Sequence, residues 1–212
     1  MKTLYIVRHG ETEWNKIGKY QGITDVPLNE NGIAQAKACG NALKNVHFDR
    51  ILSSDLSRAL VTAETIRGSR QLEITTDERL REINFGDWEK LLFSEIEERW
   101  PGLIDQMYRR PDIVKVPNGE SFQEVQDRAW SAVSDFLNEN NEDETILITC
   151  HGGTIRTILC KLLDISISHC WNFSQGNTAI NRVFYNGMGE SDHNILNLLN
   201  DTAHVDNLRG HV

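Results

Sequence analysis

The sequence predicts an α/β fold, a three-layer sandwich with a mostly parallel central sheet and helices on both faces. Two observations predict it. Short runs that are apolar on both faces, such as residues 3–7 and 145–150, are typical of strands buried in a parallel sheet. Segments with helical apolar stripes alternate with these runs, which favours helices that cover both faces of the sheet.

The first half of the fold begins with a strand at residues 3–7. A helix over residues 30–44 comes next, because apolar or small residues recur there at helical spacing: Ile33, Ala36, Gly40 and Leu43. Residues 49–54 are a second strand. It leads into a helix for which Ser54 or Asp55 would be the N-cap. The apolar stripe of that helix is Leu56, Ala59, Leu60, Ala63 and Ile66.

The second half continues with a strand at residues 145–150. The helix after it turns four apolar residues to the core: Ile155, Ile158, Leu159 and Leu162. Residues 181–185 and 193–199 are the closing strands. We therefore expect residues 1–212 to form a single domain.

Residues 86–118 interrupt this alternation, because they are rich in Trp, Pro and charged residues and predict short helices and loops. Ser121 and Glu124 then have the spacing of a capping box, ahead of an amphipathic helix. We interpret residues 86–140 as an insertion, or lid, over the C-terminal edge of the sheet.

The composition narrows the partners and the compartment. A formal net charge of −9 disfavours nucleic acid and anionic membranes as partners, although a locally positive cleft can still bind a small anion. No apolar run is long enough to span a bilayer, and residues 3–7 are too short for a signal peptide. The cysteines show no CxxC pairing, so we expect reduced, buried thiols and a cytoplasmic protein. The four cysteines are Cys39, Cys150, Cys160 and Cys170. The sequence is compatible with both a monomer and a dimer.

Two predicted strands end in the same way, with His9-Gly10 after the first and His151-Gly152 after the third. Ligands of open α/β sheets bind beyond the carboxyl ends of the strands, so both histidines would lie on one rim. Arg8 precedes His9 directly, and Arg58 lies off the apolar stripe of its helix and can point to the same rim.

Two guanidiniums and two imidazoles near helix N-termini suit a phosphoryl group. The nearby positive charge would keep an imidazole neutral, with a ring nitrogen free to attack phosphorus. Glu82 precedes a short apolar turn, where a partly desolvated carboxyl could act as the acid for the leaving oxygen. We interpret Asp87 and Glu89 as solvated surface residues.

The sequence resembles the histidine phosphatase superfamily, also called the phosphoglycerate mutase-like family. The motifs that carry the resemblance are RHGETEWN, LSSDLSRALVTAETI, LREINFGDWE, NGESFQEV and ITCHGGTIR, in the family's order between residues 4 and 158. The resemblance implies a metal-independent, cofactor-free enzyme in which His9 becomes phosphorylated and Glu82 is the proton donor. It also implies a set of residues that hold the phosphoryl group: Arg8, Arg58, His151, Asn15, Gly22 and Gly152.

The resemblance leaves a choice between phosphatase and mutase. The stretch FGDWE resembles the phosphatase branch, although Lys90 stands where that motif usually has glycine; we interpret Lys90 as solvated. Arg109 and Arg110 could bind a substrate carboxylate, as an arginine pair does in mutases, but we favour a solvated basic patch. The substrate would be a small phosphorylated metabolite, such as a sugar phosphate, phosphoglycerate or α-ribazole phosphate.

Three alternatives stay open beside this phosphomonoesterase. The first is a cofactor-dependent phosphoglycerate mutase. The second is a non-catalytic module that binds phosphate-like anions. The third is a metal hydrolase with His9, His151 and Glu82 as ligands. The positive charge of two arginines at the site opposes a bound metal cation there.

Overall fold

A central sheet of six strands, in the order β3-β2-β4-β1-β5-β6, organises the computed structural model, which describes residues 1–140, 143–189 and 193–208. The pairs β1–β4, β2–β4 and β2–β3 are parallel, whereas β5 and β6 are added antiparallel. The mostly parallel sheet is therefore confirmed. The strands are β1 (Lys2–Arg8), β2 (Arg50–Ser53), β3 (Ile74–Thr76), β4 (Thr145–Cys150), β5 (Ile180–Tyr185) and β6 (Ile195–Asp201).

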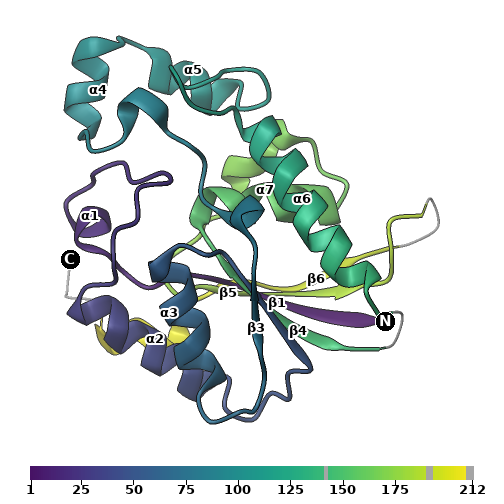
Figure 1. Cartoon of the computed structure of the whole chain (residues 1–212). Coiled ribbons are helices and arrows are strands. Elements are labelled where there is room, and N and C mark those ends of the chain that lie inside the picture. Colours follow the sequence, from purple (N-terminus) through teal and green to yellow (C-terminus); the bar gives the residue numbers. More distant parts are fainter. Residues whose placement is uncertain (141–142, 190–192, 209–212) are drawn as a thin grey trace.

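Helices cover both faces of the sheet, with α2 and α3 on one face and α6 and α7 on the other (Figure 1). Short 3₁₀ turns (η1–η4) join several of these elements. The three-layer α/β sandwich predicted from the sequence is thus confirmed. The helices are α1 (Glu13–Lys16), α2 (Glu30–Ala42), α3 (Ser57–Arg67), α4 (Phe93–Arg99), α5 (Leu103–Arg109), α6 (Phe122–Asn138) and α7 (Gly152–Leu162). The 3₁₀ turns are η1 (Glu78–Leu80), η2 (Gly86–Trp88), η3 (Ile167–Asn172) and η4 (Ala203–Leu208).

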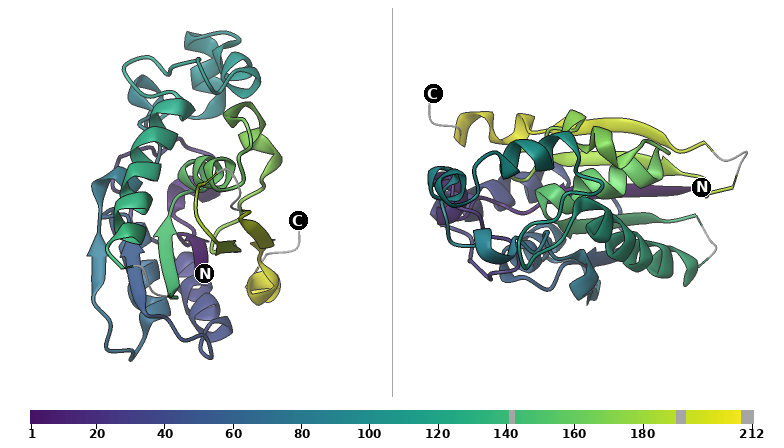
Figure 2. Two further views of the ribbon diagram at one scale, coloured as in Figure 1. Left: turned by 90° about the vertical axis from the view of Figure 1, so that its right-hand side faces the viewer. Right: turned by 90° about the horizontal axis from the view of Figure 1, so that it is seen from above.

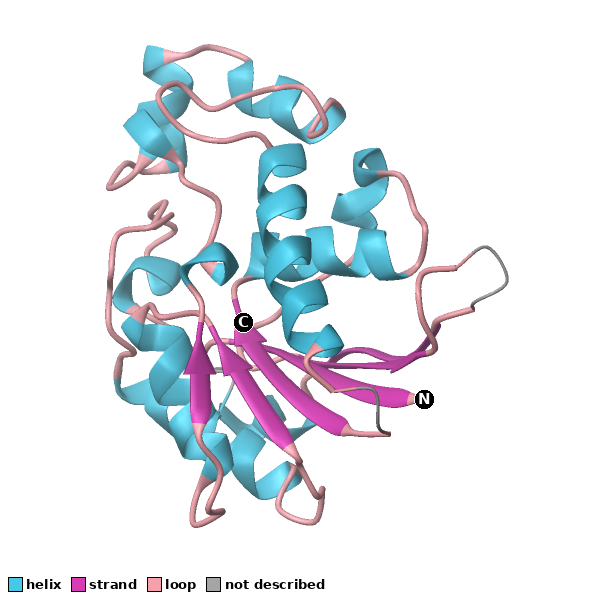
Figure 3. Ribbon diagram, turned by 45° about the vertical axis from the view of Figure 1, so that its right-hand side comes forward, coloured by secondary structure: helices cyan, strands magenta, loops and turns pink. Residues whose placement is uncertain are grey.

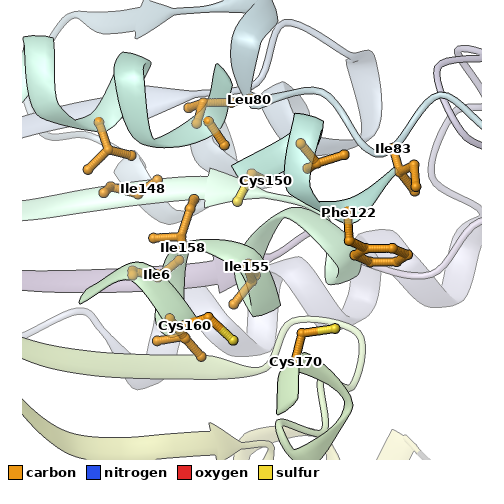
Figure 4. Close-up of a cluster of buried hydrophobic side chains, with 14 of the residues drawn as sticks. Ile6, Leu80, Ile83, Phe122, Ile148, Cys150, Ile155, Ile158, Cys160 and Cys170 are labelled. Carbon is orange, nitrogen blue, oxygen red and sulfur yellow. The ribbon is translucent and has the colours of Figure 1, made fainter. Parts of the chain in front are cut away.

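The apolar strand β1 supplies side chains to two separate cores, because successive residues of a strand point to opposite faces. Leu4 and Ile6 lie in the larger core beneath α6 and α7, whereas Tyr5 and Val7 lie in the smaller core beneath α2 and α3. In the larger core, Ile6 of β1 packs close to side chains of β4 and α7 (Figure 4). Each such side chain contributes roughly 1.5–3 kcal/mol by its burial.

Two details of the helices differ from the prediction. Ile33 is 40% exposed, because α2 turns Gly32 and Ala36 to the protein instead. Neither Ser54 nor Asp55 caps the next helix: α3 begins after Leu56, whose side chain makes no capping bond.

The segment expected to form an insertion contains two different parts. Helices α4 and α5 form a lobe at one end of the molecule (Figure 2), towards which the parallel strands point (Figure 3). Helix α6 instead packs on α7 in the layer over the sheet, and its Ser121–Glu124 capping box is formed. Within the described residues, none of the helices is long and apolar enough to cross a membrane.

Candidate active site

A cavity of about 310 Å³ lies beyond the carboxyl ends of β1 and β4. Its walls come from residues far apart in the sequence, and they include seven of the eight predicted site residues. These seven are Arg8, His9, Asn15, Gly22, Arg58, Glu82 and Gly152. The eighth, His151, is fully buried next to His9 and is not part of the wall.

The parallel pairing of β1 with β4 brings the two histidines together. Arg8 is in register with Cys150, and the backbone N–H of His9 donates to the Cys150 carbonyl at 3.0 Å. The next residue of each chain segment is a histidine, so the His9 and His151 rings meet with centroids 5.2 Å apart. The turns at His9-Gly10 and His151-Gly152 therefore form a single site.

The ring of His9 is held in one orientation by its own loop. Its Nδ1 lies 2.6 Å from the Gly10 carbonyl oxygen, an acceptor only, so Nδ1 carries the proton and Nε2 carries the lone pair. Burial lowers the pKa of His9 well below its usual value, and the charges of Arg58 and Arg8 lower it further. His9 is therefore a neutral imidazole with a free nucleophilic nitrogen.

His151 is fixed by a hydroxyl from the end of β2. Its Nε2 lies 2.8 Å from Ser54 Oγ, and this contact explains why Ser54 is not a helix cap. Its Nδ1 has no hydrogen-bond partner among the described residues. Burial lowers the pKa of His151 well below its usual value, and the nearby Arg58 adds to the effect.

Arg58 is a fully buried arginine at the start of α3. Its guanidinium donates to the carbonyls of Gly22 at 2.7 Å and Thr24 at 2.9 Å. Glu89 holds this loop from the other side, because its carboxylate accepts the backbone N–H of Ile23 at 2.8 Å and of Thr24 at 3.1 Å. The interpretation of Glu89 as a solvated surface residue was therefore wrong.

Arg8 directly precedes His9 at the end of β1 and also lines the cavity. One of its terminal nitrogens donates to the Gln175 carbonyl at 2.7 Å, while its Nε has no partner among the described residues. Burial lowers the pKa of Arg8 to about 10, against the opposing effect of Glu82. The group remains charged at neutral pH, so both arginines of the predicted site are cations that share the cavity with a neutral imidazole.

Glu82 lines the same cavity as His9 and is half-buried, as expected. Its carboxylate accepts the backbone N–H groups of Gly153 at 3.0 Å and Thr154 at 3.2 Å, which belong to the first turn of α7. Its backbone carbonyl accepts a bond from Arg128 at 2.9 Å. Both ends of the residue are thus held in place.

Asn15 reaches the cavity wall from the short helix α1. It closes a capping box with Thr12, whose hydroxyl also donates to Gln21 at 2.8 Å. Gln21 lines the cavity as well, but no signal in the sequence singled it out.

The arginine pair on the lobe does not reach the cavity. Arg109 pairs with Asp105 and Arg110 with Asp112, and all four of these side chains lie outside the cavity wall. Lys90 is exposed, as expected, but has a φ of 72°, a conformation that favours glycine. The third arginine in the wall is Arg156, which was not among the predicted site residues.

The metal-hydrolase alternative requires ligands that converge on one point. Within residues 1–140, 143–189 and 193–208, no three His, Cys, Asp or Glu side chains are grouped so that they could hold a metal ion. His9, His151 and Glu82 therefore do not form the ligand set that this alternative assumed.

An α/β sheet whose rim carries a neutral imidazole, one buried and one partly buried guanidinium, and a carboxylate around a single cavity defines an enzyme of the phosphoryl-transfer class. Comparison with known proteins agrees with this class. Residues 4–201 match the histidine phosphatase superfamily (branch 1). The chain belongs to this family, whose members act through a phosphohistidine, and it is a phosphoric monoester hydrolase.

Three relatives illustrate the range of the family. Phosphoserine phosphatase 1 of Hydrogenobacter thermophilus is 33% identical over 97% of this chain and 95% of its own length. The probable phosphoglycerate mutase GpmB of Salmonella choleraesuis is 33% identical over 87% of this chain and 86% of its own. The structure of Bacillus stearothermophilus YhfR is 34% identical, covers 97% of this chain and all of its own, and superposes with a TM-score of 0.89.

Proposed function

We propose that the chain hydrolyses small phosphomonoesters in two steps, with His9 as the nucleophile and Glu82 as the proton donor. In the first step His9 Nε2 forms a bond to phosphorus while the bond from phosphorus to the ester oxygen breaks. Glu82 gives its proton to that oxygen, and the alcohol leaves. In the second step Glu82 takes a proton from water as the water oxygen attacks phosphorus, and the electron pair of the P–N bond returns to Nε2.

The orientation of the His9 ring carries this proposal. The bond from Nδ1 to the Gly10 carbonyl leaves Nε2 unprotonated. Arg8 and Arg58 then supply the positive charge that stabilises the phosphoryl oxygens during transfer. Asn15, Gly22 and Gly152 complete the wall around them, and His151 supports the His9 side of the site.

Detection of the phosphoenzyme tests the proposal. Wild-type protein incubated with p-nitrophenyl phosphate and quenched in alkali should gain the mass of one phosphoryl group, which treatment with acid should remove. His9→Ala should show neither the gain nor turnover. His169→Ala is the matched control, because His169 is exposed and lies outside the cavity wall. A phosphoryl group that persists in His9→Ala would refute the assigned nucleophile.

A phosphoglycerate mutase is the second candidate, because one relative bears that name. A mutase must bind the carboxylate of its phosphoglycerate, and the arginine pair expected for this is committed to aspartates outside the cavity. The lobe arginines therefore give a mutase no support, and hydrolysis is favoured because the phosphatase relative aligns over more of this chain, 97% against 87%. Turnover of 3-phosphoglycerate with and without added 2,3-bisphosphoglycerate separates the two, since a mutase forms 2-phosphoglycerate faster than it releases phosphate.

We also propose that the lobe of α4 and α5 acts as the lid of this single domain. Met107 and Tyr108 at the end of α5 line the cavity, so the leaving group would contact them.

The natural substrate would be a small phosphorylated metabolite. A cytoplasmic site of action is supported by the four cysteines, which are all free thiols.

A further inference from the structure

The cavity holds a third guanidinium that the phosphoryl chemistry does not require. Arg156 lies on α7, one turn after Gly152, and lines the cavity. Its Nε donates to the Phe173 carbonyl at 2.8 Å, and its guanidinium carbon lies 5.4 Å from the centre of the Trp171 ring. These two contacts fix the direction in which the guanidinium points.

Arg156 has no acidic partner. Among residues 1–140, 143–189 and 193–208, no carboxylate lies within ion-pair distance of it, whereas Arg109 and Arg110 on the lobe each pair with an aspartate. Burial lowers its pKa, against the opposing effect of Glu82. A partly buried guanidinium without a counter-charge is unfavourable unless a ligand supplies the negative charge.

The position of Arg156 separates it from the two phosphoryl arginines. Its Nη1 and the Nε of Arg8 each lie 3.3 Å from the point that a Cβ on Gly152 would occupy, so the two groups flank this glycine. Beyond it, Arg156 rests on Trp171, whose ring centroid is 4.4 Å from that of Tyr108 on the lobe. This aromatic wall faces the part of the cavity that the leaving group would fill.

We propose that Arg156 binds a carboxylate on the leaving group, so that the preferred substrates are phosphate esters of small hydroxy acids. The inference rests on the function proposed above. A carboxylate matches the planar donor set of a guanidinium and supplies the missing counter-charge. The indole N–H of Trp171, which has no partner among the described residues, is a further donor beside it. Arg8 and Arg58 remain free to hold the phosphoryl group.

Two pairs of esters that differ in a carboxylate test this assignment. 3-Phosphoglycerate is compared with glycerol 3-phosphate, and O-phosphoserine with O-phosphoethanolamine. Wild-type protein should favour the carboxylated member of at least one pair. Arg156→Met keeps an apolar side chain against Trp171 and should lower kcat/KM for that member by about 10- to 100-fold, mainly through KM. The partner ester should lose less than about threefold. Arg156→Lys should restore part of the difference.

Arg109→Met is the matched control, because Arg109 is an exposed lobe arginine outside the cavity wall. It should leave both ester pairs unchanged. Equal losses on both members of each pair in Arg156→Met, or no preference in the wild type, would overturn the carboxylate assignment. A selective loss in Arg109→Met would assign the carboxylate to the lobe instead. Phosphohistidine formation in Arg156→Met keeps this outcome separate from a failure of the His9 mechanism.

Discussion

The segment that carries Glu82 is held by Arg128, and replacing this arginine gives the sharpest test of how the proposed acid is positioned. Arg128 of α6 donates to the backbone carbonyls of Arg79 at 2.7 Å, Arg81 at 2.8 Å and Glu82 at 2.9 Å. Its other donors bind both carboxylate oxygens of Glu120, at 2.8 and 2.9 Å. We expect Arg128→Met to release this segment from the layer over the sheet.

The cost in stability follows from these contacts. Three carbonyls and one carboxylate lose their partner, at about 1 kcal/mol for each. The Arg128 and Glu120 side chains are 21% and 22% exposed, so water replaces part of the loss. We therefore expect Arg128→Met to lower the free energy of unfolding by about 3 kcal/mol. Urea denaturation at pH 7.5 measures it.

The effect on catalysis distinguishes positioning from mere stability. If Arg128 holds Glu82 in place, Arg128→Met should slow an alkyl phosphate, whose poor leaving group needs the proton, by about tenfold or more. p-Nitrophenyl phosphate needs no such proton and should lose less than about threefold. Glu82→Gln should show the same pattern more strongly. Both kcat/KM values are measured well below the unfolding transition.

Arg79→Met is the control for this experiment. Arg79 pairs with Asp77 and Asp135 at the surface and is 38% exposed, so its replacement should cost less than about 1 kcal/mol and leave the dependence on leaving group unchanged. Equal slowing of both esters in Arg128→Met would show that the arginine only stabilises the fold. An unfolding free energy equal to that of the wild type would refute the argument altogether.

Two further predictions concern protonation and backbone conformation. The pKa values of His9 and His151 are lowered by burial and by Arg58, so the unfolded chain binds protons that the folded protein does not. The free energy of unfolding should therefore be highest above about pH 6.5 and should fall as the pH falls, by up to about 2.7 kcal/mol per pH unit for both histidines together. Urea denaturation between pH 7.5 and 5 measures this change. A free energy of unfolding that does not vary with pH would contradict the lowered pKa values. Lys90→Gly should raise the free energy of unfolding by roughly 1 kcal/mol, because a left-handed conformation costs a non-glycine residue about that much. Lys90 has φ 72° and is exposed, so an unchanged midpoint of thermal unfolding would count against strain at this position.

The sequence was sufficient for the parts of the site that are built by local rules. A buried parallel strand ends on the rim of its sheet, so His9 and His151 could be placed together from the two apolar runs before them. Arg58 could be placed from its position off the apolar stripe of α3. Arg156 follows Gly152 by four residues on the same helix, and this spacing could have identified it.

Other features depend on contacts that no local pattern encodes. Serine is a common helix cap, but the hydroxyl of Ser54 binds the ring of His151, which follows another strand. The sequence around Glu89 is typical of an exposed residue, but in the structure its carboxylate accepts the backbone N–H of Ile23 from a distant loop. Strand β3 is only three residues long, and its partner β2 supplies the pairing that defines it. In each case the deciding neighbour is remote in the chain.

The proposed nucleophile and the proposed acid are held in place by different kinds of structure. The backbone of His9 is bonded to the sheet, because its N–H donates to the Cys150 carbonyl and its carbonyl accepts the N–H of Thr178 at 3.2 Å. Glu82 instead belongs to an irregular stretch between two 3₁₀ turns. In the proposed mechanism, every substrate yields the same phosphorylated intermediate once the alcohol has departed. Changes in α5 and in the aromatic wall can therefore alter which esters are accepted, while discharge of that shared intermediate depends on His9 and Glu82, neither of which belongs to the lobe.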